Sequence, residues 1–397
     1  MNIGVPKETA ANERRVAVTP DVAGRLVKSG LSVVVERGAG EAASFGDDAY
    51  GAAGATLVAT AAEAFGHSDI VLKVQPPSAQ ETRLCHEGGA LVALFQPSAE
   101  REAVTQLAAR QVTAFSLALL PRITRAQPMD VLSSQATVAG YKAVLLAAAA
   151  TGRFFPMLVT AAGTLPPARV LVLGAGVAGL QAIATARRLG AVVSAYDVRA
   201  EVKEQVESLG AAFVVLKSAA DASGTGGYAR ALTEEEQRAQ REELNRFMAE
   251  SDVIITTALV PGRRAPILVD EDAVKAMRPG TVVVDLAGEQ GGNCALSKPG
   301  ETIESENGVI VTAPLNVPSS MPTSASLMYS RNMSALLLHL VKDGDLALDF
   351  DDEITAGAVI THDGQVVHAA TKKLLNPDQA DKPAALRAEP ASEKAAS

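Results

Sequence analysis

The sequence contains no tryptophan, and aromatic residues make up only 4% of its 397 positions. The hydrophobic cores must therefore be filled mostly by alanine, valine and leucine. Only two cysteines are present, Cys85 and Cys294, and no cluster of cysteine and histidine has the spacing of metal ligands. This scarcity favours reduced, cytosolic thiols and predicts no metal site.

The charge and hydropathy patterns argue against two further classes of protein. Asp and Glu outnumber Lys and Arg by 45 to 36, and a net charge of −9 argues against a nucleic-acid-binding surface. The amino-terminal segment lacks the continuous apolar core of a signal peptide. The most apolar segment, residues 141–164, is interrupted by Lys142, Arg153 and Pro156. We therefore expect a buried helix there and no direct insertion into a membrane.

Short apolar segments typical of strands alternate with helical periodicity along most of the chain. This alternation predicts an α/β fold with two doubly wound, Rossmann-like parallel-sheet domains joined by long helices. One connecting helix is expected over residues 136–150, capped by Ser133 or Ser134, and another over residues 324–341. We expect an N-terminal domain from residues 1–130 plus 325–375, a second domain from residues 135–320, and a disordered tail over residues 376–397.

The expected strands can be placed individually. In the first domain they cover residues 2–5, 32–35, 70–74, 90–95 and 112–116, with a helix over 19–29. In the second they cover residues 170–173, 192–196, 213–216, 253–258, 281–287 and 309–312, with a charged helix over 233–249. Near the carboxyl terminus, Asp363-Gly364 predicts the turn of a β-hairpin.

The most informative motif is the hexapeptide from Gly174 to Gly179, GAGVAG, which follows an apolar strand and begins a helix. The first glycine makes the tight turn, the second lets the backbone approach a pyrophosphate, and the third packs the helix against the strand. The helix N-terminus then faces the phosphates with its free N–H groups. Asp197 ends a second strand roughly 20 residues on, where a carboxylate accepts hydrogen bonds from ribose hydroxyls and repels a 2′-phosphate. The motif predicts that residues 135–320 bind NAD(H) rather than NADP(H).

The histidines offer no clear proton donor for an ordinary dehydrogenase. Such an enzyme needs a general acid or base near the nicotinamide and a cation for the substrate carboxylate. No histidine lies at the carboxyl end of a strand in the second domain, so we expect all five to be structural or exposed. They are His67, His86, His339, His362 and His368.

A polar loop over residues 119–134 joins the two predicted domains, where α/β proteins bind ligands. Two interpretations remain open. Its side chains could contact a ligand, or the loop could be a hinge whose Arg–Asp pair only fixes domain orientation. The residues concerned are Arg122, Arg125, Gln127, Asp130, Ser133 and Ser134.

Four segments carry a resemblance to a known family. They are GVPKET…NERRVAVTP, PRITRAQPMDVLSSQATVAGYKAV, GAGVAGLQAIATARRLGAVVSAYDVR and TTALVPGRRAPILV…VVDLAGEQGGNCALS. Together they resemble the alanine dehydrogenase/transhydrogenase superfamily, and more closely the NAD(H)-binding subunits of proton-translocating NAD(P) transhydrogenases. The resemblance covers about residues 1–375. The loop from Arg122 to Ser134 is its specific part, because the glycine motif alone does not separate members of the superfamily.

The resemblance implies roles for individual residues. Arg122 and Ser133 would hold the nicotinamide carboxamide, Gln127 would reach the partner's nucleotide, and Asp130 would orient the reduced ring. Gln127 and Asp130 are thus the catalytic candidates. The remaining cofactor-binding candidates are Gly174, Ala175, Gly176 and Val177 at the pyrophosphate, Asp197, Val198 and Arg199 at the adenosine, Gly227 and Tyr228 in a mobile lid, and Gln240 and Leu259.

Departures from the alanine dehydrogenase branch bear on the reaction. Arg15 and Lys73 stand where that branch binds the pyruvate carboxylate, but Gln96 stands where it has its catalytic histidine. Glu289 stands where it has an aspartate. The missing imidazole disfavours alanine deamination, whereas direct hydride transfer between two nicotinamides needs no proton donor.

The resemblance also implies partners. One complete dinucleotide fingerprint is present, so NADP(H) would be bound by another subunit, and proton translocation would occur in separate membrane-spanning subunits. The chain would be a cytoplasmic homodimer, peripheral on the inner face of the plasma membrane through these subunits. Two alternatives are an alanine dehydrogenase-like enzyme and a non-catalytic NAD(H)-sensing module.

Overall fold

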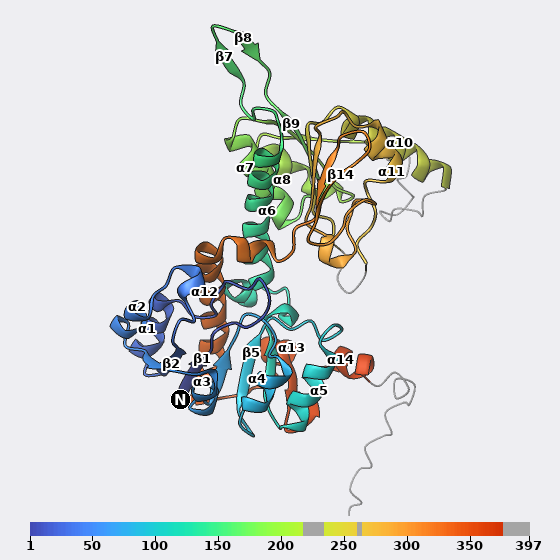
Figure 1. The fold of residues 1–397 in the computed structure, drawn as a ribbon. Helices are drawn as coiled ribbons and strands as arrows, with labels where there is room; N and C mark the ends of the chain where they lie inside the picture. The colour runs from blue at the N-terminus through green and yellow to red at the C-terminus, as the bar shows by residue number, and fades with distance from the viewer. Residues whose placement is uncertain (217–233, 260–263, 376–397) are drawn as a thin grey trace, which may run out of the picture.

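The structure is a computed structural model that describes residues 1–216, 234–259 and 264–375 (Figure 1). Its first lobe is built on an eight-stranded sheet with the order β19-β18-β6-β5-β4-β1-β2-β3. The six strands from β1 to β6 are parallel in the order 3-2-1-4-5-6, the doubly wound arrangement. The strands are β1 (Asn2–Val5), β2 (Ser32–Glu36), β3 (Thr56–Val58), β4 (Ile70–Leu72), β5 (Ala90–Ala93), β6 (Thr113–Ser116), β18 (Val359–His362) and β19 (Gln365–Val366).

The helices of this lobe connect and cover its strands. They are α1 (Pro20–Lys28), α2 (Asp47–Ala52), α3 (Ala61–Gly66), α4 (Ala79–Leu84), α5 (Arg101–Ala109), α13 (Glu353–Ala358) and α14 (Ala369–Leu375). Strands β18 and β19 come from the far end of the chain. They extend the sheet because β18 pairs antiparallel with β6.

The second lobe is built on a seven-stranded sheet, β11-β10-β9-β12-β13-β15-β14, whose six parallel strands repeat the order of the first lobe. Only β14, at one edge, is antiparallel. The strands are β9 (Arg169–Leu173), β10 (Val192–Tyr196), β11 (Ala212–Phe213), β12 (Val253–Thr256), β13 (Val282–Asp285), β14 (Thr302–Glu304) and β15 (Ile310–Thr312), and the helices are α7 (Val177–Arg188), α8 (Lys203–Ser208), α10 (Glu234–Ala249) and α11 (Glu271–Ala276). The predicted fold class, two doubly wound parallel-sheet lobes, is confirmed.

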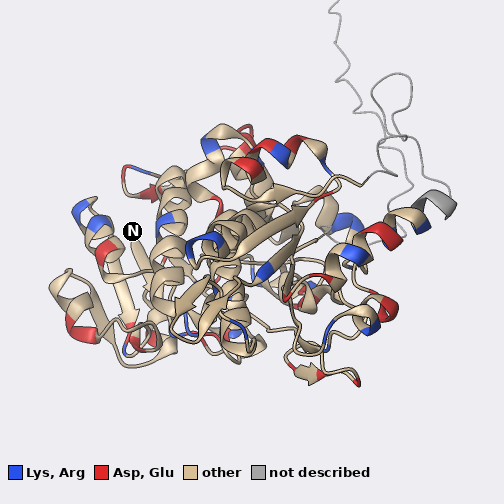
Figure 2. Cartoon of the chain, turned by 90° about the horizontal axis from the view of Figure 1, so that it is seen from above, with Lys and Arg blue, Asp and Glu red and all other residues tan. Residues whose placement is uncertain are grey.

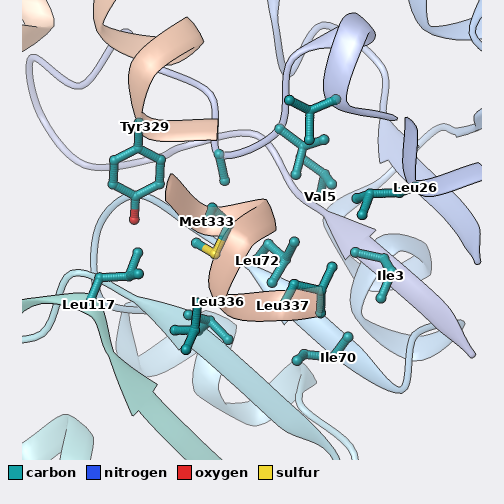
Figure 3. Close-up of a cluster of buried hydrophobic side chains, with 14 of the residues drawn as sticks. Ile3, Val5, Leu26, Ile70, Leu72, Leu117, Tyr329, Met333, Leu336 and Leu337 are labelled. Atoms are coloured by element: carbon teal, nitrogen blue, oxygen red, sulfur yellow. The ribbon is translucent and has the colours of Figure 1, made fainter. Parts of the chain in front are cut away.

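Two long helices join the lobes, α6 (Val131–Ala150) and α12 (Pro322–Leu340) (Figure 1). The α12 helix lies in the core of the first lobe, where Met333 and Leu337 pack beside Ile3 and Leu72 (Figure 3). The α6 helix packs against both α7 and α12. Among the described residues, α6 is the one helix that is long and apolar enough to cross a membrane by length and composition.

Several expectations need correction. The α6 helix begins at Val131 rather than near Ser133, because the Asp130 carboxylate caps it by accepting a hydrogen bond from Ser133 N at 2.9 Å. The helix ends at Ala150, so the expectation of a buried helix over residues 141–164 is wrong beyond that point. The chain then runs without helix or strand to an antiparallel hairpin, β7 (Leu158–Thr160) and β8 (Gly163–Leu165), that is largely exposed.

Other local expectations hold or fall outside the described residues. The sequence does not predict strand β3, since its three residues follow a glycine-rich segment with no clear alternation. The carboxyl-terminal hairpin is confirmed, with Asp363 and Gly364 both at positive φ, 46° and 73°. Residues 376–397, the expected tail, lie outside the described residues. Figure 2 shows acidic and basic residues interspersed over the described portion of the chain.

The crossing of α6 and α7 depends on Gly140. A Cβ atom built there would lie 2.0 Å from the carbonyl oxygen of Ala178. We expect Gly140→Ala to lower the free energy of unfolding by about 2 kcal/mol, because the backbones must separate. Urea unfolding measures the change. In the control, Gly51→Ala, the new Cβ on α2 meets nothing within 4 Å, so the better helix propensity should raise stability by up to about 1 kcal/mol. Equal shifts in the two variants would contradict the close crossing.

Candidate functional site

The glycine turn has the geometry that the sequence predicts. Gly174 lies at φ +100°, which only glycine adopts readily, and a Cβ at Gly179 would lie 1.9 Å from the Gly174 carbonyl oxygen. A Cβ at Gly176 would meet nothing within 4 Å. Gly174 and Gly179 are thus required by the protein's own backbone. Gly176 is not, and the open space beside it fits the approach of a pyrophosphate.

Asp197 lies directly against this turn. Its carboxylate accepts hydrogen bonds from Ala175 N at 2.7 Å and from the Arg199 guanidinium at 3.0 Å on each oxygen, and from Arg199 N at 2.9 Å. Burial raises the pKa of Asp197, but these hydrogen bonds outweigh burial and hold the pKa below its ordinary value. Asp197 is therefore an ionised acceptor, as a ribose-binding residue must be.

The Asp197 carboxylate has all its acceptor positions in use. A carboxylate offers about four lone-pair sites, and Ala175 N and three N–H groups of Arg199 occupy them. If the Arg199 side chain swings away, two of these sites become free, enough for two neighbouring ribose hydroxyls. Val198, between the two residues, is almost fully exposed at this edge.

The loop after β6 holds the next group of candidates. A short 3-10 helix, Thr124–Met129, buries Ala126 and Met129 in the core of the first lobe. Gln127 in this helix and Arg122, two residues before it, are exposed. The two buried residues anchor the loop in the first lobe, and the two polar side chains are exposed to solvent.

At the end of the loop, Asp130 and Ser133 contact each other. Ser133 Oγ donates a hydrogen bond to Asp130 Oδ2 at 2.6 Å. Arg125, by contrast, pairs with Asp352 at 2.8 Å rather than with Asp130. Asp352 begins α13 in the same lobe as the loop, so this ion pair does not span the two lobes. The hinge interpretation in its Arg–Asp form is therefore wrong.

Two of the remaining cofactor-binding candidates lie on the second lobe. Leu259 follows β12 and is about half exposed, and Gln240 lies partly exposed on α10. Gly227 and Tyr228 lie outside the described residues. Among the described residues, no hydrogen bond links the loop over 122–130 to the glycine turn.

Arg15 and Lys73 already have carboxylate partners within the chain. Arg15 donates to both oxygens of Glu13, at 2.9 and 2.7 Å, and Lys73 Nζ contacts Glu8 at 3.1 Å and Glu81 at 2.8 Å. Burial raises the pKa of Glu13, but the hydrogen bonds and charge of Arg15, together with a hydrogen bond from Gln75, outweigh burial and lower the pKa to about 2. A substrate carboxylate would have to compete with these buried ion pairs.

Asn316 was missed by the sequence prediction and connects the two lobes. Its backbone N–H donates to Glu289 of the second lobe at 2.6 Å, and its side chain contacts Arg15 at 3.1 Å and Glu13 at 3.0 Å. It lies at φ 43°, a left-handed conformation that asparagine tolerates better than most residues. An asparagine shortly before a proline is the one local signal that could have indicated it.

Neither Gln96 nor any of the five histidines lies at the glycine turn. Gln96 is exposed beyond β5 in the first lobe. Four histidines have local partners in the first lobe: His86 contacts Ser68 O, His339 contacts Asp352, His362 contacts Thr113, and His368 contacts Thr371. His67 caps the end of α3. Within the described residues, no group of three or more metal-ligand side chains could hold a metal ion.

Comparison with known proteins covers both lobes. Residues 4–139 match the family described as alanine dehydrogenase/PNT, N-terminal domain, and residues 143–369 match alanine dehydrogenase/PNT, C-terminal domain. The chain is 48% identical over 379 residues to the first portion of the NAD(P) transhydrogenase alpha subunit of Rhodospirillum rubrum, covering 93% of this chain and 98% of the relative. A solved transhydrogenase from Sinorhizobium meliloti superposes with a TM-score of 0.84 at 45% identity, over 92% of this chain and 100% of that one. A solved L-alanine dehydrogenase superposes with a TM-score of 0.79 at 30% identity, over 95% and 99% of the two chains.

Proposed function

The chain belongs to the alanine dehydrogenase/PNT family, among the NAD(P) transhydrogenase alpha subunits, and we propose that it binds NAD(H) and exchanges hydride directly with NADP(H) on a partner subunit. The observation that carries the proposal is the 48% identity to such a subunit over nearly the whole chain. The glycine turn with Asp197 supports nucleotide binding, and the outward-facing loop beyond β6 supports a site shared with a partner.

In the proposed reaction, this chain orients the reacting nicotinamides and transfers no protons. The nicotinamide supplies the transferred hydride, and catalysis then depends on distance and alignment. Ser133 is suited to hold a carboxamide. Its hydroxyl proton is committed to Asp130, so its lone pairs are left to accept an amide N–H. Arg122 and Gln127 are both exposed. Arg122 would share the carboxamide with Ser133, and Gln127 would reach the partner's nucleotide.

The same proposal assigns partners and location. We place NADP(H) on a partner subunit and proton translocation in membrane-spanning subunits, with this chain on the cytoplasmic side. The relative is itself named as a portion of an alpha subunit, which supports an assembly of several chains. Gly174, Ala175, Gly176 and Val177 would face the pyrophosphate, and Asp197, Val198 and Arg199 the adenosine.

One pair of assays tests the function. The purified chain is given NADH, pyruvate and ammonia, and separately NADH, an NADP⁺ analogue and the membrane subunits in vesicles. We expect transfer only in the second mixture. NADH oxidation in the first mixture alone would establish an alanine dehydrogenase and overturn the proposal. NADH binding without activity in either mixture would favour a sensing module.

We also propose that the chain forms a homodimer through the β7–β8 hairpin. The hairpin projects from the second lobe (Figure 1) and exposes Met157, Leu165 and Val159, the last at 73%. Exposed apolar arms of this kind are typical of interfaces. We expect the chain to sediment as a dimer and Val159→Glu to shift it toward a monomer, measured by analytical ultracentrifugation. Thr164→Glu, on an already polar position of the hairpin, is the control. A wild-type monomer would refute this assignment.

A further inference from the structure

The loop between β6 and α6 is fixed to the first lobe at two points outside its own sequence. Asn332 of α12 donates a hydrogen bond from Nδ2 to the carbonyl oxygen of Pro128 at 2.7 Å. Arg125 donates from Nη2 to Asp352 Oδ1 at 2.8 Å. These two contacts lie on either side of Gln127, so the loop is held from both directions.

Asp352 is the organising group of the second contact. Its other oxygen, Oδ2, contacts His339 Nε2 of α12 at 2.9 Å and accepts from Ile354 N and Thr355 N at 3.1 Å each. The carboxylate thus ties together the loop, α12 and the start of α13. Its side chain is only 13% exposed, whereas the Arg125 side chain that reaches it is 62% exposed. The fixed partner is therefore the aspartate.

The loop's own packing completes the arrangement. Ala126 and Met129 are buried on the same side, and backbone hydrogen bonds join Ala126 N to Ile123 O and Asp130 N to Gln127 O. Between these two buried residues Gln127 and Pro128 are exposed, and Gln127 is the one of the two with a polar side chain. Its side chain makes no hydrogen bond to the described residues, so its position depends on the backbone beneath it.

We propose that Asp352 is a positioning residue for hydride transfer. Through Arg125 and His339 it holds the backbone of the loop, and thereby the outward direction of Gln127 and Arg122. This inference rests on the proposed function, in which those side chains contact the two nucleotides. Reacting groups that are displaced by about 1 Å lose roughly a hundredfold in rate, so a loosened loop should reduce turnover without reducing nucleotide binding.

The test is Asp352→Asn in the full chain, assembled with its membrane subunits. Asparagine keeps an oxygen to cap α13 but removes the charge that holds Arg125 and His339. We expect the rate of hydride transfer to fall about tenfold while the Kd for NADH changes less than about twofold, as for a positioning defect. Amide hydrogen exchange in the free chain should speed up about tenfold at Ala126 and Asp130, since local opening becomes easier.

The matched control is Asp47→Asn. Asp47 begins α2, forms an ion pair with Arg37 at 3.4 Å and accepts a hydrogen bond from Gly38 N at 2.9 Å, remote from the loop. We expect this variant to leave both the transfer rate and exchange at Ala126 unchanged. Asp352→Asn with Arg125→Gln should be no slower than Asp352→Asn alone, because Asp352→Asn already removes the ion pair with Arg125.

The outcomes separate this inference from the proposed function. Unchanged exchange at Ala126 and Asp130 in Asp352→Asn would overturn the positioning role whatever the activity. A loss of NADH binding equal to the loss of rate would overturn it as well. A wild-type assembly with no hydride transfer would refute the proposed function, and hydrogen exchange in the free chain would then still decide whether Asp352 holds the loop.

Discussion

Asp197→Ala is expected to weaken NADH binding by about 3 kcal/mol, roughly a hundredfold in Kd, the value of one or two hydrogen bonds to a charged acceptor. The variant removes the carboxylate that would accept the ribose hydroxyls. It also removes the acceptor of the hydrogen bond from Ala175 N, which is 2.7 Å long and fixes the backbone of the glycine turn. Isothermal titration of the free chain with NADH measures the change directly.

The charge of Asp197 should matter separately from its size. Asp197→Asn keeps an acceptor of the same length, so we expect a smaller loss of NADH affinity than in the alanine variant. The neutral amide no longer repels a 2′-phosphate, and Arg199 is freed to approach one, so NADPH binding should improve relative to NADH. Unchanged preference for NADH in Asp197→Asn would show that another residue sets the nucleotide specificity.

Gln127→Asn is expected to slow hydride transfer about a hundredfold while the Kd for NADH stays within about twofold of the wild type. The substitution shortens an exposed side chain by one methylene and leaves its amide intact. Because Gln127 has no hydrogen-bonding side-chain partner among the described residues, stability should not change. Single-turnover measurements on the assembled complex separate the transfer step from nucleotide binding and release.

The control for this variant is Gln205→Asn, on the exposed side of α8. It makes the same chemical change on the second lobe, away from the loop, and should leave transfer unaffected. Equal loss of NADH binding in Gln127→Asn and Asp197→Ala would contradict the separate roles assigned to the two residues.

The sequence was sufficient to predict features that depend on residues close together in the chain. The glycine turn and Asp197 lie in one stretch of 24 residues whose strand, turn and helix can be recognised from their own composition. All the parallel strands except β3 were predicted, because they are continuous apolar segments buried on both faces. Their ends were overestimated, as in β12, because apolar residues continue past Thr256 after pairing has stopped.

What the sequence could not reveal depends on contacts between distant residues. Asn316 meets Arg15 across 301 positions, and Asp352 meets Arg125 across 227. Neither residue is unusual in its own neighbourhood. The β7–β8 hairpin was missed for a different reason. Its apolar side chains are exposed, but they give the segment the same composition as a buried helix.

The pairing of β18 with β6 imposes an order of assembly on the growing polypeptide. Val359 is paired with Phe115, and α12 supplies Met333 and Leu337 to the core around Ile3. The ribosome therefore completes the entire second lobe before it makes the last pieces of the first. During synthesis the second lobe can fold on its own sheet, whereas the first lobe still lacks the strands and the helix that complete its core. The first lobe, although its synthesis begins first, can therefore complete its sheet and core only after residues 322–362 have been made.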